Sequence, residues 1–218
     1  MTQRLLDGNN SGGDDLVKAV IEKTIFPQIC RQLGINESSW KNLFSENGNT
    51  NAVSNWSALR TKLVQFLWVP VVRYIWGLAE KGKECIDVPI SDMLLQAMST
   101  SVNTQLQKVI NSLNPDGTSD VKSVKITLTK DDLYRVVKQV LQKILMIYGG
   151  LVSQFDCDML VFAGRASGLP TIKDLVTELC PLGPGRCIFL QGYPADSNWF
   201  PFLGEDNRIS DAKFCTVV

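Results

Sequence analysis

The sequence has 218 residues, of which 44% are hydrophobic, and its 22 basic side chains are balanced by 22 acidic ones. The formal net charge of +0 gives no overall field that would attract nucleic acid or an anionic membrane. Histidine is absent, which excludes histidine-based catalytic triads and most zinc chemistry. The longest apolar run, Phe66 to Val72, contains Pro70 and is too short to span a bilayer.

The start of the chain and its cysteines favour a cytoplasmic protein. Near the N-terminus only Leu5 and Leu6 stand between Arg4 and Asp7, so no secretory apolar region is present there. The six cysteines are scattered without a Cys-x-x-Cys pair. We expect them to be reduced and mostly buried, with a zinc or disulfide framework as the alternative.

The first half of the chain predicts helices. An apolar pattern at helical spacing begins near Asp14, bends at Pro27 and ends at Gly34. A second, long pattern carries an aromatic stripe, which at this spacing predicts a buried core rather than a ligand site. The further elements expected up to residue 117 are a helical turn at Trp40–Phe44, a long helix at Trp56–Ala79 with a kink near Pro70, an extended piece at Cys85–Ile90 and a helix at Asp92–Leu113.

The last third alternates strands and helices. Val124 to Leu128 alternates like a half-buried strand, and Thr129 with Asp132 forms a capping box for a helix that Gly149-Gly150 should end. A strand at 158–162, a helix to Cys180 and a strand from Cys187 to Leu190 follow. This order predicts parallel pairing of the last two strands through a right-handed crossover.

A turn of small residues joins the strand at 158–162 to the helix that Pro170 opens. Such a turn leaves backbone N–H groups unpaired at a helix N-terminus, and small side chains let a ligand come close to them. The small residues Gly164, Ala166, Ser167 and Gly168 therefore predict a site for a phosphate or a nucleotide.

The turn also carries a family resemblance. Gly-Arg-Ala-Ser-Gly-Leu-Pro, residues 164–170, resembles without a gap the Gly-Gly-Ser-Thr-Arg-Ile-Pro adenosine motif of the actin, sugar-kinase and DnaK-type chaperone ATPase superfamily. The resemblance implies that this turn packs against the adenosine and phosphates of ATP or ADP. Arg165 replaces a glycine of the motif, and Gly168 replaces the arginine that stacks on adenine. Arg165 either contacts a phosphate or blocks the approach.

Two further segments match the chaperone pattern. Gly12-Gly13-Asp14-Asp15 looks like the Gly-Gly-Glu-Asp loop that opens a helix at the base of the second lobe. Glu80 and Lys83 have the spacing of a Glu-x-x-Lys pair that touches ribose and adenine, although Glu84 replaces the arginine that follows. The alternatives are a solvated charge pair at a helix end for Glu80 and Lys83, and stabilisation of the helix dipole for Asp14 and Asp15.

The tail of the chain is similar to the bacterial SrfB family of virulence factors. The similarity is strongest after Val124 and rests on the order of short motifs: residues 165–170, Pro-Gly-Arg-Cys-Ile at 184–188, Trp-Phe-Pro-Phe at 199–202 and Arg-Ile-Ser-Asp-Ala-Lys at 208–213. The two resemblances together imply the second lobe of an actin-like, ribonuclease H-like ATPase. Its expected fold is α/β with a small, mostly parallel sheet plus a helical insertion subdomain. The expected parts are 1–34 and 121–218 as the α/β core, with 35–120 as the insertion.

The resemblance further implies that the chain is a fragment. We expect almost the whole first lobe to be absent, along with the phosphate loop and the carboxylates for Mg²⁺. The missing lobe and other virulence-associated proteins are then the expected partners, in the bacterial cytoplasm, with export as an effector left open. No catalytic residue, no metal ligand, no ATP turnover and no tight nucleotide binding are expected from the fragment alone. The alternative is an interaction module that kept this fold and lost the nucleotide.

Overall fold

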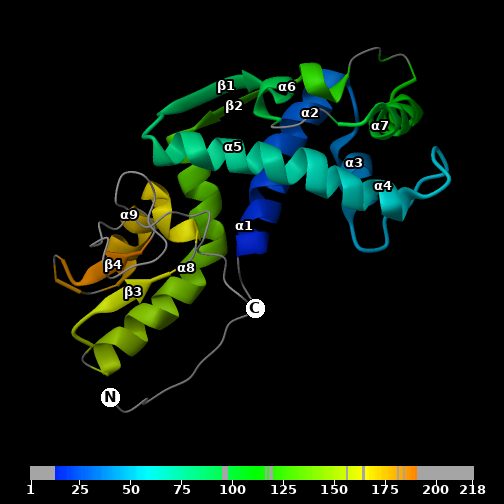
Figure 1. The fold of residues 1–218 in the computed structure, drawn as a ribbon. Helices are drawn as coiled ribbons and strands as arrows, with labels where there is room; N and C mark the ends of the chain where they lie inside the picture. The colour runs from blue at the N-terminus through cyan, green and yellow to red at the C-terminus, as the bar shows by residue number, and fades with distance from the viewer. Residues whose placement is uncertain are drawn as a thin grey trace, which may run out of the picture. The chain divides into compact units, whose positions relative to one another are not determined.

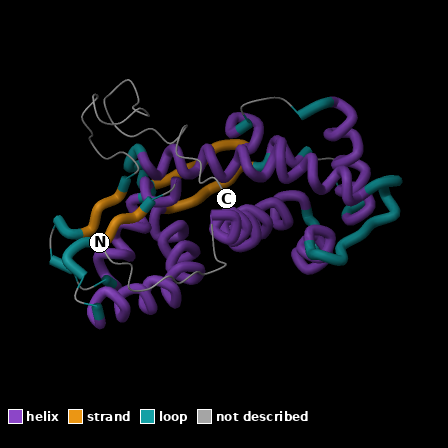
Figure 2. The backbone as a smooth tube through the Cα atoms, turned by 60° about the horizontal axis from the view of Figure 1, so that its bottom comes forward, coloured by secondary structure: helices purple, strands orange, loops and turns teal. Residues whose placement is uncertain are grey.

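The computed structural model describes residues 13–94, 98–115, 117, 120–155, 157–163, 165–180, 182–183 and 185–190. Helices dominate the described part of the chain, and the strands are short (Figure 2). The residues fall into two compact units, one made of Met1–Leu16 and Tyr134–Val218 and the other of Val17–Leu133. The expected division at residues 34 and 120 concerns lobes of a larger fold and stays a prediction.

The unit Val17–Leu133 is mostly helical (Figure 1). Its core holds an aromatic cluster in which the ring of Phe26 lies 5.9 Å from that of Trp40 and 5.3 Å from that of Trp68, edge to face in both pairs. The aromatic stripe is therefore core, as predicted, except for Phe66, which is 38% exposed. The described helices that lie wholly or partly in this unit are α1 (Gly13–Val20), η1 (Ile21–Ile25), α2 (Phe26–Leu33), α3 (Glu37–Phe44), α4 (Trp56–Leu63), η2 (Val64–Trp68), α5 (Val69–Glu80), α6 (Ile90–Met93), α7 (Thr100–Leu113) and η3 (Val121–Ser123).

Both prolines that were expected to bend helices follow a π-helical turn. The segments η1 and η2 are π-helices, closed by hydrogen bonds from Phe26 N–H to the Ile21 carbonyl and from Val69 N–H to the Val64 carbonyl. Pro27 and Pro70 come next in the chain. A proline has no N–H to donate, and its ring clashes with the carbonyl four residues earlier in a regular α-helix. The wider turn is a known way to accommodate such a break, so the chain stays helical through both prolines.

The ends of several helices agree with the sequence. Gly34 adopts the left-handed conformation, with φ 65°, directly after α2. Thr129 and Asp132 form the predicted capping box: each backbone N–H donates to the other side chain at 3.1 Å. Two predictions were wrong. Gly149-Gly150 does not end α8 (Lys130–Gln154), and the helix expected at Asp92–Leu113 begins only at Thr100, where Ser99 caps α7.

The strands of the described residues form two separate two-stranded sheets, whereas a single, mostly parallel sheet was expected. In the first, β1 (Cys85–Pro89) pairs antiparallel with β2 (Lys125–Thr129), with Asp87 opposite Thr127. In the second, β3 (Leu160–Phe162) pairs parallel with β4 (Cys187–Phe189), with Val161 opposite Ile188. The prediction of parallel pairing is confirmed for β3 and β4. The described structure is thus mixed α/β, with small sheets.

Candidate functional site

The segment from β3 to β4 has the predicted order of strand, turn, helix and strand. After β3 the chain forms a 3-10 turn, η4 (Arg165–Gly168), and then α9 (Pro170–Leu179), before β4 returns parallel to β3. In Figure 1 this segment is the yellow-to-orange part of its unit. Ligands of parallel α/β sheets bind at the carboxyl ends of the strands, and η4 follows the carboxyl end of β3. The four candidate residues 164–167 therefore lie at, or next to, this turn.

The candidate residues of the turn are described to different extents. Gly164 lies outside the described residues, and only the backbone of Arg165 and Ala166 is described. Ser167 is 3% exposed and takes part in an interaction within the fold. The structure thus brings Arg165, Ala166 and Ser167 together in one 3-10 turn.

The first turn of α9 offers fewer free N–H groups than the sequence predicts. Pro170 has none, and the N–H groups of Ile172 and Lys173 both donate to the Leu169 carbonyl, at 3.0 and 3.2 Å. Leu169, at the cap position, has no side chain that could accept a hydrogen bond. In the first turn of α9, Thr171 is therefore the main residue left to offer a backbone N–H group to an anion.

Thr171 is a residue that sequence reasoning missed. Its side chain is 2% exposed, and its hydroxyl oxygen has no hydrogen-bond partner among the described residues. Leaving such a hydroxyl unpaired in the interior costs about 1–3 kcal/mol. A threonine two residues after the cap is common enough that the sequence gives no signal for its burial.

A positive charge lies near the same sheet. The Lys173 ammonium is 5.7 Å from the centre of the Phe189 ring, and that ring stacks on Phe162 at 5.2 Å, with 13° between the planes. An ammonium in this position is attracted by the ring face. It ties α9 to the β3–β4 pair.

The other candidate residues lie elsewhere in the chain. Gly12 is outside the described residues, and Gly13 is the exposed first residue of α1, followed by exposed Asp14 and Asp15. Among the described residues, no atom outside its chain neighbours and its own helix backbone lies within 4 Å of the position that a Cβ of Gly13 would take. Gly13 belongs to the same unit as η4, whereas Glu80 and Lys83 belong to the other unit.

Glu80 and Lys83 mark the end of α5. Gly82 has φ 74° and donates its N–H to the Ala79 carbonyl at 3.0 Å, and Lys83 N–H donates to the Leu78 carbonyl at 3.1 Å. These two bonds form a Schellman motif. Both side chains are exposed, and Glu80 takes part in an interaction within the fold. The Glu-x-x-Lys spacing thus coincides with a standard helix terminus.

A second polar cluster, also missed from sequence, links α8 to α9. The Tyr134 hydroxyl donates to Glu178 Oε2 at 2.5 Å, and Lys138 Nζ donates to Glu178 Oε1 at 2.8 Å. The hydrogen bond from Lys138, followed by that from Tyr134, lowers the pKa of Glu178, and the bond to Glu178 raises the pKa of Tyr134 and that of Lys138. The helical spacing of Tyr134 and Lys138 is visible in the sequence, but the contact with Glu178 is not.

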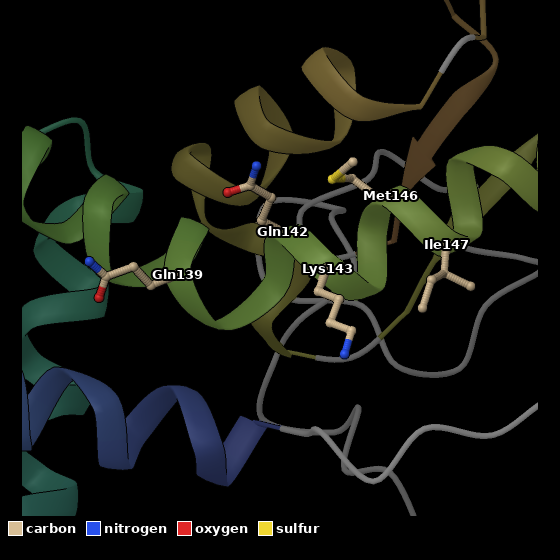
Figure 3. A pocket seen from close by; sticks show the side chains of 5 residues that line it. All are labelled: Gln139, Gln142, Lys143, Met146 and Ile147. Carbon is tan, nitrogen blue, oxygen red and sulfur yellow. The ribbon is translucent and has the colours of Figure 1, made fainter.

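An open pocket of about 470 Å³ runs along α8. Gln142 and Met146 project in one row along the helix and Lys143 and Ile147 in the next (Figure 3). Met146 is 56% exposed and Ile147 48% exposed. The described lining, which also includes Gln139, therefore combines apolar surface with amides and one ammonium and holds no acidic group.

Comparison with known proteins decides the family. The model of the family described as Virulence factor SrfB matches residues 1–218, which is the whole chain. The chain belongs to the SrfB family. No curated protein and no solved structure shows significant similarity to it.

This SrfB chain shows neither a metal centre nor a membrane span in the residues that the structure describes. None of those residues form a group of three or more Cys, Asp or Glu placed to hold a metal ion. None of the helices found there is long and apolar enough to cross a membrane. The five cysteines within the described ranges are free, with Cys30 and Cys180 buried and Cys85 exposed.

Proposed function

We propose that the β3–η4–α9–β4 segment is the adenosine- and phosphate-contacting part of a nucleotide site, in one half of an actin-like or DnaK-type ATPase core of a SrfB virulence factor. The observation that supports this most is the buried, unpartnered hydroxyl of Thr171, in the helix turn that follows the small-residue turn. A ligand oxygen or its bound water would give this hydroxyl the partner that it lacks.

The residues present fit the phosphate part of a nucleotide. The turn lies at the carboxyl end of a parallel strand, its side chains are small apart from Arg165, and Arg165 supplies a guanidinium that pairs well with phosphate. The binding would depend on the turn backbone, Arg165 and Thr171 more than on the helix dipole, because few free N–H groups remain at α9. The ribose and adenine contacts expected of Glu80 and Lys83 stay a separate prediction, because these two residues belong to the other unit.

The residues do not fit the magnesium ion that accompanies ATP. Within the described ranges no three acidic side chains gather, so the carboxylates that hold Mg²⁺ and orient water belong to other parts of the protein in this proposal. Hydrolysis by this chain alone is not proposed.

The proposal is tested by calorimetry of ATP binding to the SrfB-family protein that contains both proposed lobes and this chain. Arg165→Ala should weaken binding by roughly 1.5–3 kcal/mol, the range for a hydrogen bond to a charged group. Gly164→Val should weaken it further, because a branched side chain would stand where ligand atoms must lie. Unchanged affinity in both variants, with both still folded, would contradict the proposal.

Thr171→Val separates ligand binding from stability. Valine fills the same volume without the unpartnered hydroxyl, so the ligand-free protein should be as stable as the parent or more stable, while ATP affinity should fall by about 0.5–1.5 kcal/mol. Thr177→Val is the matched control, because its hydroxyl donates to the Lys173 carbonyl at 2.9 Å on the same helix. Equal ATP affinity in both threonine variants would remove the support that Thr171 gives.

One set of observations favours the alternative, a protein-interaction module without nucleotide. The unit that contains η4 exposes large apolar side chains, Met146, Ile147, Met159 and Val161. Met146 and Ile147 are neighbours on α8, and contiguous exposed apolar side chains are typical of contact surfaces. This second function would be favoured if none of the Gly164, Arg165 and Thr171 variants changed ATP binding and Met146→Lys abolished binding of a partner protein.

A further inference from the structure

The two edges of the β1–β2 sheet are treated differently by the rest of the chain. On the β2 edge, glutamine side chains of α2 take the place of a third strand. Gln28 accepts from Thr127 N–H at 2.8 Å and donates to the Thr127 carbonyl at 2.9 Å. Gln32 does the same for Lys125, at 3.0 and 2.7 Å. A side-chain amide carries one acceptor and one donor group, so it can imitate the backbone of a neighbouring strand.

The next residue of this edge is closed as well. Thr129 N–H donates to the Asp132 carboxylate in the capping box. The backbone N–H and C=O groups of Lys125, Thr127 and Thr129 point away from β1. The N–H of each of these residues donates to a side chain. Open edges are a liability that proteins cover or block, and the β2 edge is covered.

No described residue covers the β1 edge in this way. Bonds from Ile90 N–H to the Val124 carbonyl and from Lys130 N–H to the Glu84 carbonyl fix the alternation, so the even-numbered residues of β1 face β2. Cys85 and Asp87 therefore turn their N–H and C=O groups outward, together with the Pro89 carbonyl. In the described structure none of these outward groups has a hydrogen-bond partner, and Cys85 and Asp87 are exposed. In Figure 1, β1 runs along the border of its unit.

We propose that the outer edge of β1 is a docking site for an extended segment of another polypeptide, which adds to the sheet as a third strand and places a Lys or Arg opposite Asp87. Addition of a strand to an open edge is a common mode of peptide recognition, in which backbone bonds give affinity and side-chain pairs give specificity.

The chemistry of the partner follows from the pairing that Asp87 already makes on its other side. There the carboxylate accepts from the Thr127 hydroxyl at 2.9 Å and lies 3.5 Å from Lys125 Nζ. The Asp87 side chain remains 54% exposed, so it has room for another cation on the open side. Oppositely charged cross-strand pairs stabilise a sheet, and like charges opposite each other destabilise it.

The same charge argues against a second copy of this chain as the occupant. In the antiparallel registers that pair Asp87 with Asp87 or with Cys85 of another copy, the two Asp87 carboxylates stand opposite or diagonal to each other. The register that pairs Cys85 with Cys85 places Asp87 opposite Lys83, whose N–H already donates to the Leu78 carbonyl and cannot extend the ladder. Pro89 further removes one N–H from the ladder that two copies would share. A foreign segment with a basic residue avoids both problems.

The test uses two synthetic peptides, acetyl-Thr-Val-Lys-Val-Thr-amide and the same peptide with Glu in place of Lys. Amide exchange is followed by NMR on the whole chain, at about 1 mM peptide, a concentration suited to weak binding. The Lys peptide should slow exchange at Cys85 and Asp87 and leave Lys125 and Thr127 unchanged, since glutamines already hold those two. It should bind about 2- to 30-fold more tightly than the Glu peptide.

Two substitutions at one position separate the backbone from the charge. Asp87→Pro removes the outward N–H but none of the bonds to β2, so it should abolish binding of both peptides. Asp87→Ala keeps the N–H and should bind both peptides equally, which keeps the test valid if the proline variant does not fold. The proposal is overturned if neither amide is protected, if protection appears on the β2 edge instead, or if protection grows with protein concentration without peptide.

Discussion

Removal of the glutamine side chains that cover β2 should destabilise the unit Val17–Leu133 by a predictable amount. Gln28→Leu and Gln32→Leu keep the size of the side chain and each delete two hydrogen bonds to the strand backbone. At about 0.5–1.5 kcal/mol per bond, each variant should lose about 1–3 kcal/mol of unfolding free energy. Gln28 should lie at the upper end, because it is half-buried and also donates to the Thr24 carbonyl at 2.8 Å.

The measurement combines urea unfolding with amide exchange. Tryptophan fluorescence reports on this unit, since Trp40, Trp56, Trp68 and Trp76 are all buried in it. Exchange at Lys125 and Thr127 reports on the released N–H groups directly. The matched control is Gln105→Leu, whose amide reaches only Ser101 Oγ on its own helix, at 3.3 Å, so less than about 0.5 kcal/mol should be lost. If all three variants unfold alike and neither amide exchanges faster, the reasoning about the β2 edge is wrong.

Three further results are expected. Leu67→Ala, at a fully buried position, should cost about 2–5 kcal/mol in urea unfolding, whereas Phe66→Ala, at its 38% exposed neighbour, should cost clearly less, and equal losses would contradict the core assignment. Gly150→Ala, inside α8, where no described atom beyond the chain neighbours and the helix's own backbone lies within 4 Å of the added Cβ, should raise stability by about 0.5–1 kcal/mol, and a lower melting temperature would contradict it. The pKa of Glu178 is lowered in the fold, so its contribution to stability is present above its ordinary pKa of 4.5 and is lost as the pH falls through the lowered pKa. Glu178→Gln should therefore flatten the fall in unfolding free energy below about pH 5, and an unchanged fall would contradict the link between α8 and α9.

Local chemistry written within a few residues was readable from the sequence. The capping box of Thr129 and Asp132, the left-handed Gly34 and the strand, turn and helix around Pro170 all follow from short-range rules. The parallel pairing of β3 with β4 follows from the helix between them. Each of these features depends on neighbours in the chain.

The errors arose where tertiary packing or an unusual local geometry outweighed those rules. Gly149 and Gly150 were expected to end α8, but Gly149 is buried within it and Val152, further along the same helix, is buried as well. Burial of that face stabilises the helix beyond the propensity cost of two glycines, about 1 kcal/mol each. The π-turns before Pro27 and Pro70 likewise have no signal other than the prolines themselves.

The turn that carries the candidate site was predictable in position, but its hydrogen bonding and burial were not. The turn at residues 164–167 was located from small residues between a strand and Pro170. The pairing of Ile172 N–H with Leu169, and the burial of the Thr171 hydroxyl, depend on how η4 meets α9, and no spacing rule reports that. The same holds for the glutamines that cover β2, which lie more than 90 residues from their partners in sequence.

Photolabelling with 8-azido-ATP tests the central claim most directly. Light-activated label on the SrfB-family protein that contains this chain, mapped by mass spectrometry, should fall within residues 159–173 or at residues 80–83, and excess ATP should prevent it. At a nucleotide concentration well below the Kd, Arg165→Ala should reduce that labelling by about tenfold or more, as the loss of a charge-assisted hydrogen bond requires. Labelling that is absent from both segments, or that excess ATP does not prevent, would contradict a nucleotide site in this chain.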